Sequence, residues 1–118
     1  MEENCIFCKI VNKEIPVKMI YENDNFVAFP DVAPQIKGHC LIVSKKHFVN
    51  SLDIPATLGN ELIGAIKSIF ELKVKEDKSI EGFNIVQNNF PVAGQIVMHA
   101  HWHFLPRRKD DGKHLRLE

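Results

Sequence analysis

Three of the six histidines in this 118-residue chain alternate with apolar residues in the stretch Met98-His99-Ala100-His101-Trp102-His103-Phe104. Successive side chains of an extended strand point to opposite faces, so the histidines would line one face and the apolar residues the other. We expect the apolar face to pack against a helix. The histidine face would then meet water, a metal ion or a ligand.

The residues around this stretch predict an α+β fold. Five segments have the alternation or composition of strands, and they are residues 19–21, 26–29, 40–43, 82–87 and 97–105. Apolar residues recur at three- and four-residue steps from about Ala56 to Lys75, which predicts one long helix. A short N-terminal helix is expected at Cys8–Val11. Strands on both sides of a single long helix favour an antiparallel five-stranded sheet over alternating βαβ units.

The length and charge of the chain are typical of one soluble domain. No repeat or linker interrupts residues 1–118, so we expect a single domain with its core at about residues 5–108. The charged residues 107–118, beginning just after Pro106, would form a solvent-exposed tail. The 15 basic and 15 acidic side chains cancel, which argues against a protein that coats nucleic acid. A small nucleotide needs only a few directed donors and stays compatible with this balance.

The sequence also argues against membrane insertion and export. No segment approaches the roughly 20 apolar residues of a membrane helix, and the N-terminus has no basic lead followed by an apolar run. We therefore expect a cytoplasmic protein without a membrane partner. In that reducing setting Cys5, Cys8 and Cys40 would be thiols or metal ligands.

Two kinds of chemistry would explain the alternating histidines. Packing alone is a poor explanation, because buried polar groups need partners. The histidines either act on an anion such as a phosphate, one as nucleophile and the others as donors, or bind zinc. A straight row of three would be stretched around one ion, which disfavours a catalytic zinc held by this row alone. Gly94 and Gln95 precede the strand and would let backbone amides approach an oxygen.

A longer ordered set of motifs surrounds the histidines. The central part reads Gly94-Gln95-x-Val97-x-His99-x-His101-x-His103-x-x-Pro106-Arg107, and the upstream parts are residues 5–10, 14–16, 21–24, 28–31 and 38–47. This set resembles the signature of the histidine triad (HIT) family of nucleotide-binding proteins, in its Hint-like and bacterial hydrolase branch. The resemblance extends over nearly the whole chain to about Arg108.

The resemblance implies a fold and a reaction. The fold is the HIT-like α+β protomer, which pairs into a homodimer with a continuous sheet. In the family, the middle histidine attacks the α-phosphorus of a nucleotide that carries an amine, acyl or second nucleotide group. His101 would be this nucleophile, and water would hydrolyse the nucleotidyl-histidine. The partner would be a conjugate of a purine nucleotide such as AMP or GMP, and the chemical step would need no metal.

The resemblance also assigns the residues around the nucleophile. His39 and His103 would lie near the phosphate, and the main-chain carbonyl of His99 would orient His101. Asp31 would accept bonds from the ribose hydroxyls, and Val32 would flank the base. The polar residue below the nucleophile and the phosphate-binding loop would be Asn88, Gly94, Gln95, Ile96 and Val97.

One position departs from the family pattern. Ile96 stands where members often carry Ser or Glu, so no side chain there can donate to the leaving group. We expect an altered preference for the leaving group, with catalysis retained.

A second site is expected at the N-terminus. Cys5 and Cys8 are half of a zinc ligand set, and His47 and His99 would complete it if the N-terminal arm folds across the sheet. The resemblance supports this expectation, because some bacterial members of the family with this cysteine pair hold such a structural Zn²⁺ ion. The alternative is a pair of part-buried thiols without metal. No role is expected for His114.

Three functions therefore stand at this point. The first is a nucleotide phosphoramidase, nucleotidyl hydrolase or transferase that acts through His101. The second is a zinc-dependent hydrolase that uses the histidine strand, and the third is a non-catalytic nucleotide-binding adaptor.

Overall fold

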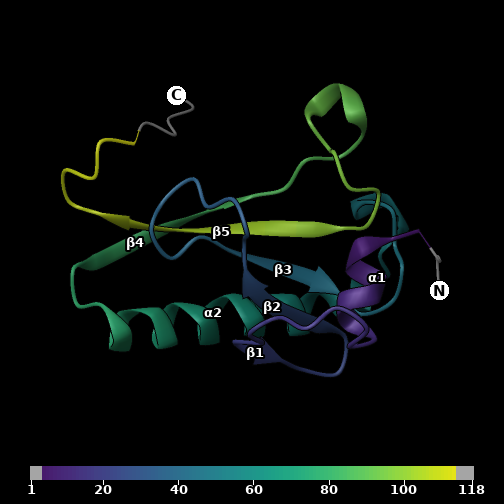
Figure 1. Ribbon diagram of the computed structural model, residues 1–118, viewed down its shortest axis with the longest axis horizontal. Coiled ribbons are helices and arrows are strands. Elements are labelled where there is room, and N and C mark those ends of the chain that lie inside the picture. The colour runs from purple at the N-terminus through teal and green to yellow at the C-terminus, as the bar shows by residue number, and fades with distance from the viewer. Residues whose placement is uncertain (1–3, 114–118) are drawn as a thin grey trace.

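A five-stranded antiparallel sheet, in the order β1-β2-β3-β5-β4, forms the frame of the molecule (Figure 1). The computed structural model describes residues 4–113. Its strands are β1 (Tyr21–Glu22), β2 (Phe26–Pro30), β3 (Cys40–Ser44), β4 (Ile80–Val86) and β5 (His101–Arg108). Its helices are α1 (Ile6–Val11) and α2 (Gly59–Glu76), with short 3₁₀ turns at Ser51–Asp53, Ala56–Leu58 and Pro91–Ala93. The α+β architecture with five antiparallel strands and one main helix is confirmed.

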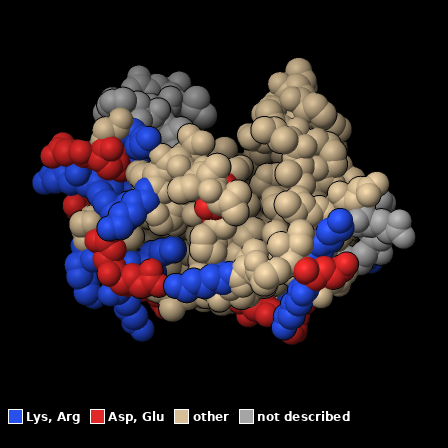
Figure 2. All heavy atoms as spheres, viewed as in Figure 1, with Lys and Arg blue, Asp and Glu red and all other residues tan. Residues whose placement is uncertain are grey.

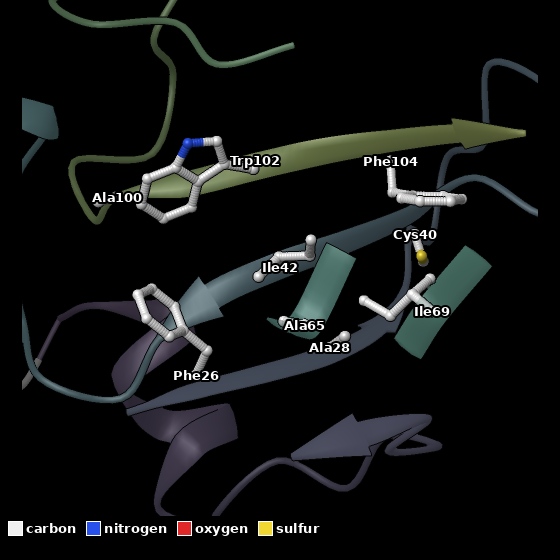
Figure 3. Packing of buried hydrophobic residues seen from close by; sticks show 9 residues of the cluster. All are labelled: Phe26, Ala28, Cys40, Ile42, Ala65, Ile69, Ala100, Trp102 and Phe104. Carbon is white, nitrogen blue, oxygen red and sulfur yellow. The ribbon is translucent and has the colours of Figure 1, made fainter. Parts of the chain in front are cut away.

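The two helices cover opposite faces of the sheet. The α2 face of the sheet carries the main core (Figure 3), which contains Phe26, Ala28, Cys40, Ile42, Ala65, Ile69, Ala100, Trp102 and Phe104. A second cluster joins α1 to the other face and contains Phe7, Ile10, Val27, Phe29, Leu41 and Val43. Strand β3 is therefore buried on both faces, as its continuous apolar run indicates. None of the helices within residues 4–113 is long and apolar enough to cross a membrane.

The last strand begins later than the alternation predicts. We expected it to span residues 97–105, but β5 begins at His101. The preceding residues bend away from the sheet, because the amide of Ala100 donates to the carbonyl of Phe48 at 2.7 Å. Met98 consequently lies outside the core, with 39% of its surface exposed. The three histidines nevertheless share the face that α1 covers, because Phe7 packs against the rings of both His99 and His101 and the His103 ring contacts that of His101. Ala100, Trp102 and Phe104 lie in the core on the opposite face.

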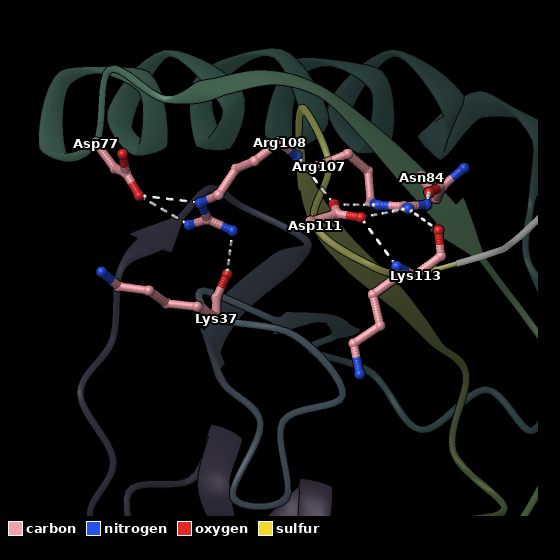
Figure 4. Close-up of polar contacts among 7 residues, drawn as sticks. All are labelled: Lys37, Asp77, Asn84, Arg107, Arg108, Asp111 and Lys113. Carbon is pink, nitrogen blue, oxygen red and sulfur yellow. Dashed lines mark hydrogen bonds and ion pairs between the residues drawn. The ribbon is translucent and has the colours of Figure 1, made fainter.

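Strand β5 continues to Arg108, so residues 107 and 108 belong to the sheet and not to the expected exposed tail. Buried Pro106 pairs with Phe83 of β4 inside the sheet. Nε and Nη2 of Arg107 donate to the two carboxylate oxygens of Asp111, and Arg108 binds Asp77 just after α2 (Figure 4). Arg107, Arg108 and Asp111 are therefore half-buried, whereas Lys109, Asp110, Gly112 and Lys113 are exposed, as expected of a tail. The remainder of the expected tail, including His114, lies outside the described residues.

Candidate functional site

A main-chain carbonyl two residues earlier in the chain orients His101, the expected nucleophile. Nδ1 of His101 lies 2.7 Å from the main-chain oxygen of His99. A carbonyl oxygen only accepts, so Nδ1 carries the proton and the lone pair of Nε2 is left to react. The edge of the Phe7 ring packs against the imidazole, with 5.1 Å between the ring centroids. His101 is thus a buried, oriented imidazole with one nitrogen available for chemistry.

His103 is oriented by a chain of bonds that begins in the loop before β3. The amide of Gln35 donates to Nδ1 of His39 at 3.0 Å, so His39 carries its proton on Nε2. That Nε2–H lies 2.9 Å from Nδ1 of His103 and 3.4 Å from an oxygen of Asp31. Nδ1 of His103 therefore accepts, and the proton of His103 sits on Nε2. Both tautomers follow from one backbone amide.

Burial keeps both of these imidazoles neutral. Loss of water around His39 and His103 lowers the pKa of each below 6.5, and the carboxylate of Asp31 opposes this shift. His103 thus offers a neutral N–H donor at pH 7.

The grouping of Asp31, His39 and His103 suits a metal poorly. Their polar atoms lie within 4.8 Å of one another, which resembles a ligand set. However, the atom of His39 that faces the other two is Nε2, and the Gln35 amide fixes a proton on it. A neutral imidazole in that state has no lone pair to give a metal at Nε2. These three residues form a hydrogen-bonded relay.

A cavity of about 430 Å³ lies in front of His101 and His103. Its apolar walls come from α1, β2 and β3 and include Ile6, Phe7, Ile10, Phe29 and Leu41. Its rim holds the other expected site residues Asp31, Val32, Asn88, Gly94, Ile96 and Val97. The volume is in the range of small-molecule sites. The fold therefore brings together the expected nucleophile and most of the expected nucleotide-binding residues.

Gln95 does not line this cavity, in contrast to the sequence expectation. Its side chain is 3% exposed and holds the loop that surrounds it. Oε1 accepts from the amide of Phe90 at 2.8 Å, and Nε2 donates to the carbonyls of Val49 and Val97 at 2.6 and 3.1 Å. Both polar atoms of this side chain are bonded within the protein, so Gln95 positions the loop.

Two backbone conformations also shape this loop. Gly94 has a φ of +96°, and a Cβ there would lie 3.4 Å from the side chain of Asn88. Phe90 has a φ of +74°, which is strained for a residue with a side chain. Two hydrogen bonds stabilise this conformation of Phe90: its amide donates to Oε1 of Gln95, and its carbonyl accepts from the amide of Gln95. Sequence reasoning missed Phe90, Phe7 and Gln35, since nothing in their residue types marks a role.

His99, the first histidine of the stretch, lies against the cysteines. Nδ1 of His99 lies 3.2 Å from the sulfur of Cys5 and 3.5 Å from that of Cys8. Nδ1 of His47 lies 3.2 Å from the sulfur of Cys8. The four ligand atoms all lie within 4.8 Å of one another. The N-terminal arm therefore places these four residues, which we name the Cys/His cluster, in one group.

The Cys/His cluster fits a tetrahedral zinc ion. With Zn–S bonds of about 2.3 Å and Zn–N bonds of about 2.0 Å, neighbouring ligand atoms lie about 3.5 Å apart. Nε2 of His99 donates to the carbonyl of Ser44 at 2.6 Å, so the lone pair of Nδ1 faces the sulfurs. Burial lowers the pKa of His99 to about 4, which keeps the imidazole in the neutral form that a ligand requires.

Comparisons with known proteins agree with one another. The model of the HIT domain matches residues 12–110. An uncharacterised HIT-like protein of Methanocaldococcus jannaschii is 44% identical over 110 residues, which are 92% of this chain and 83% of that protein. An adenosine 5′-monophosphoramidase of Candida albicans is 34% identical over 110 residues, covering 91% of this chain and 72% of its own. A crystal structure from Streptococcus mutans superposes with a TM-score of 0.89 at 37% identity, covering 100% of this chain and 74% of that one.

Proposed function

This chain belongs to the HIT domain family, and from that membership we propose that it is a nucleotide hydrolase that attacks the α-phosphate of a purine nucleotide conjugate through His101. The observation that carries the proposal is the state of His101. Its Nδ1–H is bound to the His99 carbonyl, and its Nε2 lone pair is available in a residue that lines the cavity. A neutral imidazole held in this way is a competent nucleophile at pH 7.

The proposed reaction proceeds in two displacements. Nε2 of His101 forms a bond to the α-phosphorus, and the bond from phosphorus to the leaving nitrogen or oxygen breaks with its electron pair. The leaving atom takes one proton, which the Nε2–H of His103 donates. Water then attacks phosphorus and forms the new P–O bond as the bond between phosphorus and Nε2 of His101 breaks. One proton of this water returns to Nε2 of His103. The products are the nucleoside monophosphate and the released amine, acid or nucleotide. Replacing water by another acceptor makes the same site a transferase.

The remaining cavity residues are proposed to hold the nucleotide. Oδ1 of Asp31 accepts the amide of Ala33 at 2.9 Å, which aims the carboxylate toward the cavity rim, where ribose hydroxyls would donate to it. Val32, with 98% of its surface exposed, offers an apolar side for the purine. Asn88, Gly94, Ile96 and Val97 form the wall that would face the phosphate.

A structural zinc ion in the Cys/His cluster is a separate part of the proposal. Cys5, Cys8, His47 and His99 supply the donor types and spacing for it. The ion would tie α1 to the sheet and takes no part in the chemical step.

A homodimer is also proposed, through the open edge of the sheet. Strand β4 is an edge strand of seven residues, and an uncovered edge of this length is a ready site for pairing. The exposed apolar side chain of Phe83 lies on it. Equilibrium sedimentation of the purified protein measures this state.

Replacing His101 by Asn tests the reaction. We expect the turnover of adenosine 5′-phosphoramidate to disappear, while the affinity for AMP changes by no more than severalfold, because all the other residues that line the cavity are unchanged. The matched control is His114→Asn, which should keep wild-type turnover. Full activity of His101→Asn would contradict the mechanism. AMP binding without any turnover in the wild type would favour the adaptor, and loss of turnover in proportion to zinc content would favour the metal-dependent hydrolase.

A further inference from the structure

A second cavity, of about 520 Å³, opens onto one side of the Cys/His cluster. Its lining includes two members of the cluster, Cys5 and His47, and the oxidisable side chain of Met98. The other two members, Cys8 and His99, do not line it. A small molecule that enters this cavity therefore meets Cys5 before it meets Cys8.

The three cysteines differ in their access to solvent. Cys5 is half-buried, whereas Cys8 has 1% of its surface exposed. Cys40 is fully buried in the main core, where burial raises its pKa to about 12. Oxidants react with cysteines that are accessible and able to ionise. The order of access is therefore Cys5 first and Cys8 second, with Cys40 excluded.

The sulfurs of Cys5 and Cys8 lie close enough to join. Cys5 is the N-cap residue of α1, and the amide of Cys8 donates to its sulfur at 3.3 Å. The two sulfurs lie within 4.8 Å of each other, and both contact Nδ1 of His99. An S–S bond is about 2.0 Å long, so the two side chains must bring their sulfurs less than about 3 Å closer. This movement stays within a single turn of the chain.

We propose that Cys5 is a site of reversible oxidation by small uncharged hydroperoxides, and that Cys8 completes the reaction by forming a disulfide with it. The sulfur of Cys5 attacks the outer oxygen of the hydroperoxide, the O–O bond breaks, and the thiol proton leaves with the departing alkoxide as an alcohol. Cys5 is then a sulfenic acid. The sulfur of Cys8 attacks that of Cys5, the S–O bond breaks, and the hydroxyl group leaves as water with the proton of Cys8. Two electrons pass from the two thiols to one hydroperoxide.

The lining of the second cavity favours an uncharged oxidant. None of the described residues that line it is Lys, Arg, Asp or Glu. The loop before β5, which projects at the upper right of Figure 2, carries no blue or red atoms. Glutathione disulfide carries several carboxylates that would need basic partners, and the cavity offers none. An organic hydroperoxide is neutral and small enough for a cavity of this volume.

The disulfide would dismantle the Cys/His cluster. A structural zinc ion needs four ligands, and a disulfide removes two of them. Helix α1 also supplies Ile6, Phe7 and Ile10 to the nucleotide cavity. Oxidation would therefore release the proposed zinc ion and loosen the helix that forms one wall of that cavity. This consequence rests on the proposed zinc ion and the proposed function, whereas the disulfide rests on neither.

The test treats the purified, reduced full chain with cumene hydroperoxide. The intact mass should fall by two hydrogens, and peptide mapping should place the link between Cys5 and Cys8. Thiols counted in denaturant should fall from three to one, and bound zinc should be released in step with the disulfide. Dithiothreitol and added zinc should restore the starting state. Glutathione disulfide at the same concentration should react at least about tenfold more slowly, because access limits thiol exchange.

Two variants separate the roles of the cysteines, and a third is the control. Cys8→Ser cannot form the link, so dimedone should trap the sulfenic acid on Cys5. In Cys5→Ser the remaining Cys8 should be oxidised at least about tenfold more slowly than Cys5 of the wild type, because it is buried. Cys40→Ala, with its change in the core away from the cluster, should form the disulfide at the wild-type rate.

Several outcomes would overturn the oxidation site. They are a disulfide between two chains, an oxygen gained by Met98 while all three thiols remain, and oxidation of Cys5→Ser at the wild-type rate. The oxidised chain should bind AMP about threefold or more weakly, because part of an apolar wall is lost. Unchanged affinity would overturn the link to the nucleotide cavity and leave the oxidation site standing. Absence of turnover for every nucleotide conjugate would overturn the proposed function, while mass and thiol counts would still decide the disulfide.

Discussion

The proton positions of two histidines depend on a single backbone amide. The Gln35 amide donates to Nδ1 of His39, and this directs the Nε2–H of His39 to His103. Donor and acceptor roles in such a pair determine which nitrogen faces the substrate. Because both rings are shielded from water, each titrates below the ordinary range, and the nearby carboxylate of Asp31 limits the shift. The residue-scale chemistry therefore depends on a balance between burial and one negative charge.

Replacing Asp31 by Asn should disturb this balance in a known direction. The carboxylate raises the pKa of His39 and His103, so its removal should lower both values further below 6.5. Both rings would then stay neutral to a lower pH. Titration of the histidine C–H resonances by NMR in the ligand-free protein measures the two values. A pKa above 6.5 for either ring in the wild type, or an upward shift in Asp31→Asn, would contradict the assignment.

At the level of the elements, α1 depends on contacts outside itself. A helix of six residues is too short to persist alone in water. Its N-cap Cys5 and its residue Cys8 belong to the Cys/His cluster, and Phe7 packs against His101, the proposed nucleophile. His99 belongs to both sites, because its side chain joins the cluster while its carbonyl holds His101. The proposed zinc site would therefore stabilise the helix that packs against His101.

Replacing Cys8 by Ala should remove the metal and lower stability. We expect one zinc per wild-type chain and none in Cys8→Ala. With free zinc at about 1,000 times its Kd, a bound ion adds about 4 kcal/mol, so Tm should fall by about 10 °C or more. Elemental analysis and thermal unfolding measure both effects. Cys40→Ala is the control, since burial raises the pKa of this core thiol to about 12 and it lies outside the cluster. That variant should keep one zinc per chain, and zinc retained in Cys8→Ala would contradict the assignment.

Local patterns were sufficient to predict most of the elements. The apolar steps of α2 and the buried run of β3 predict these segments, because burial of one face imposes a period on neighbouring residues. The start of β5 was not predictable in this way. It depends on the bond between Ala100 and Phe48, residues 52 positions apart in the sequence. A pattern of alternation has no information about such a distant partner.

The same limit applies to the candidate site. The motif predicted that His101, His103, Asp31 and the loop before β5 lie together, and residues of all these parts line one cavity. The inward position of the Gln95 side chain could not be predicted from the sequence. A Gln after a Gly is equally compatible with a bond to a ligand and with hydrogen bonds inside the protein. Its role depends on the carbonyls of Val49 and Val97, which only the folded chain places within reach.

Across the whole molecule, Arg108 joins three segments that are far apart in sequence. Its guanidinium lies 2.9 Å from the carboxylate of Asp77 after α2 and donates to the carbonyl of Lys37 before β3 (Figure 4). Bonds from Ser79, followed by that from Arg108, hold the pKa of Asp77 well below its usual range. The ionised carboxylate is therefore favoured in the folded chain, and it links the end of the sheet to the end of the long helix.

Replacing Asp77 by Asn should change how stability depends on pH. A carboxyl group whose pKa is lower in the folded than in the unfolded state stabilises the fold above the unfolded value, here near 3.8, and loses that contribution as the pH falls toward the folded value. Asp77→Asn should therefore be less stable than wild type at pH 7, and the difference should shrink below pH 3.8. Urea unfolding at a series of pH values measures the two curves. Asp24→Asn, at an exposed carboxylate of the β1–β2 turn, should give a curve parallel to wild type. A constant difference between Asp77→Asn and wild type down to the lowest pH would mean that Asp77 acts through its shape and not its charge.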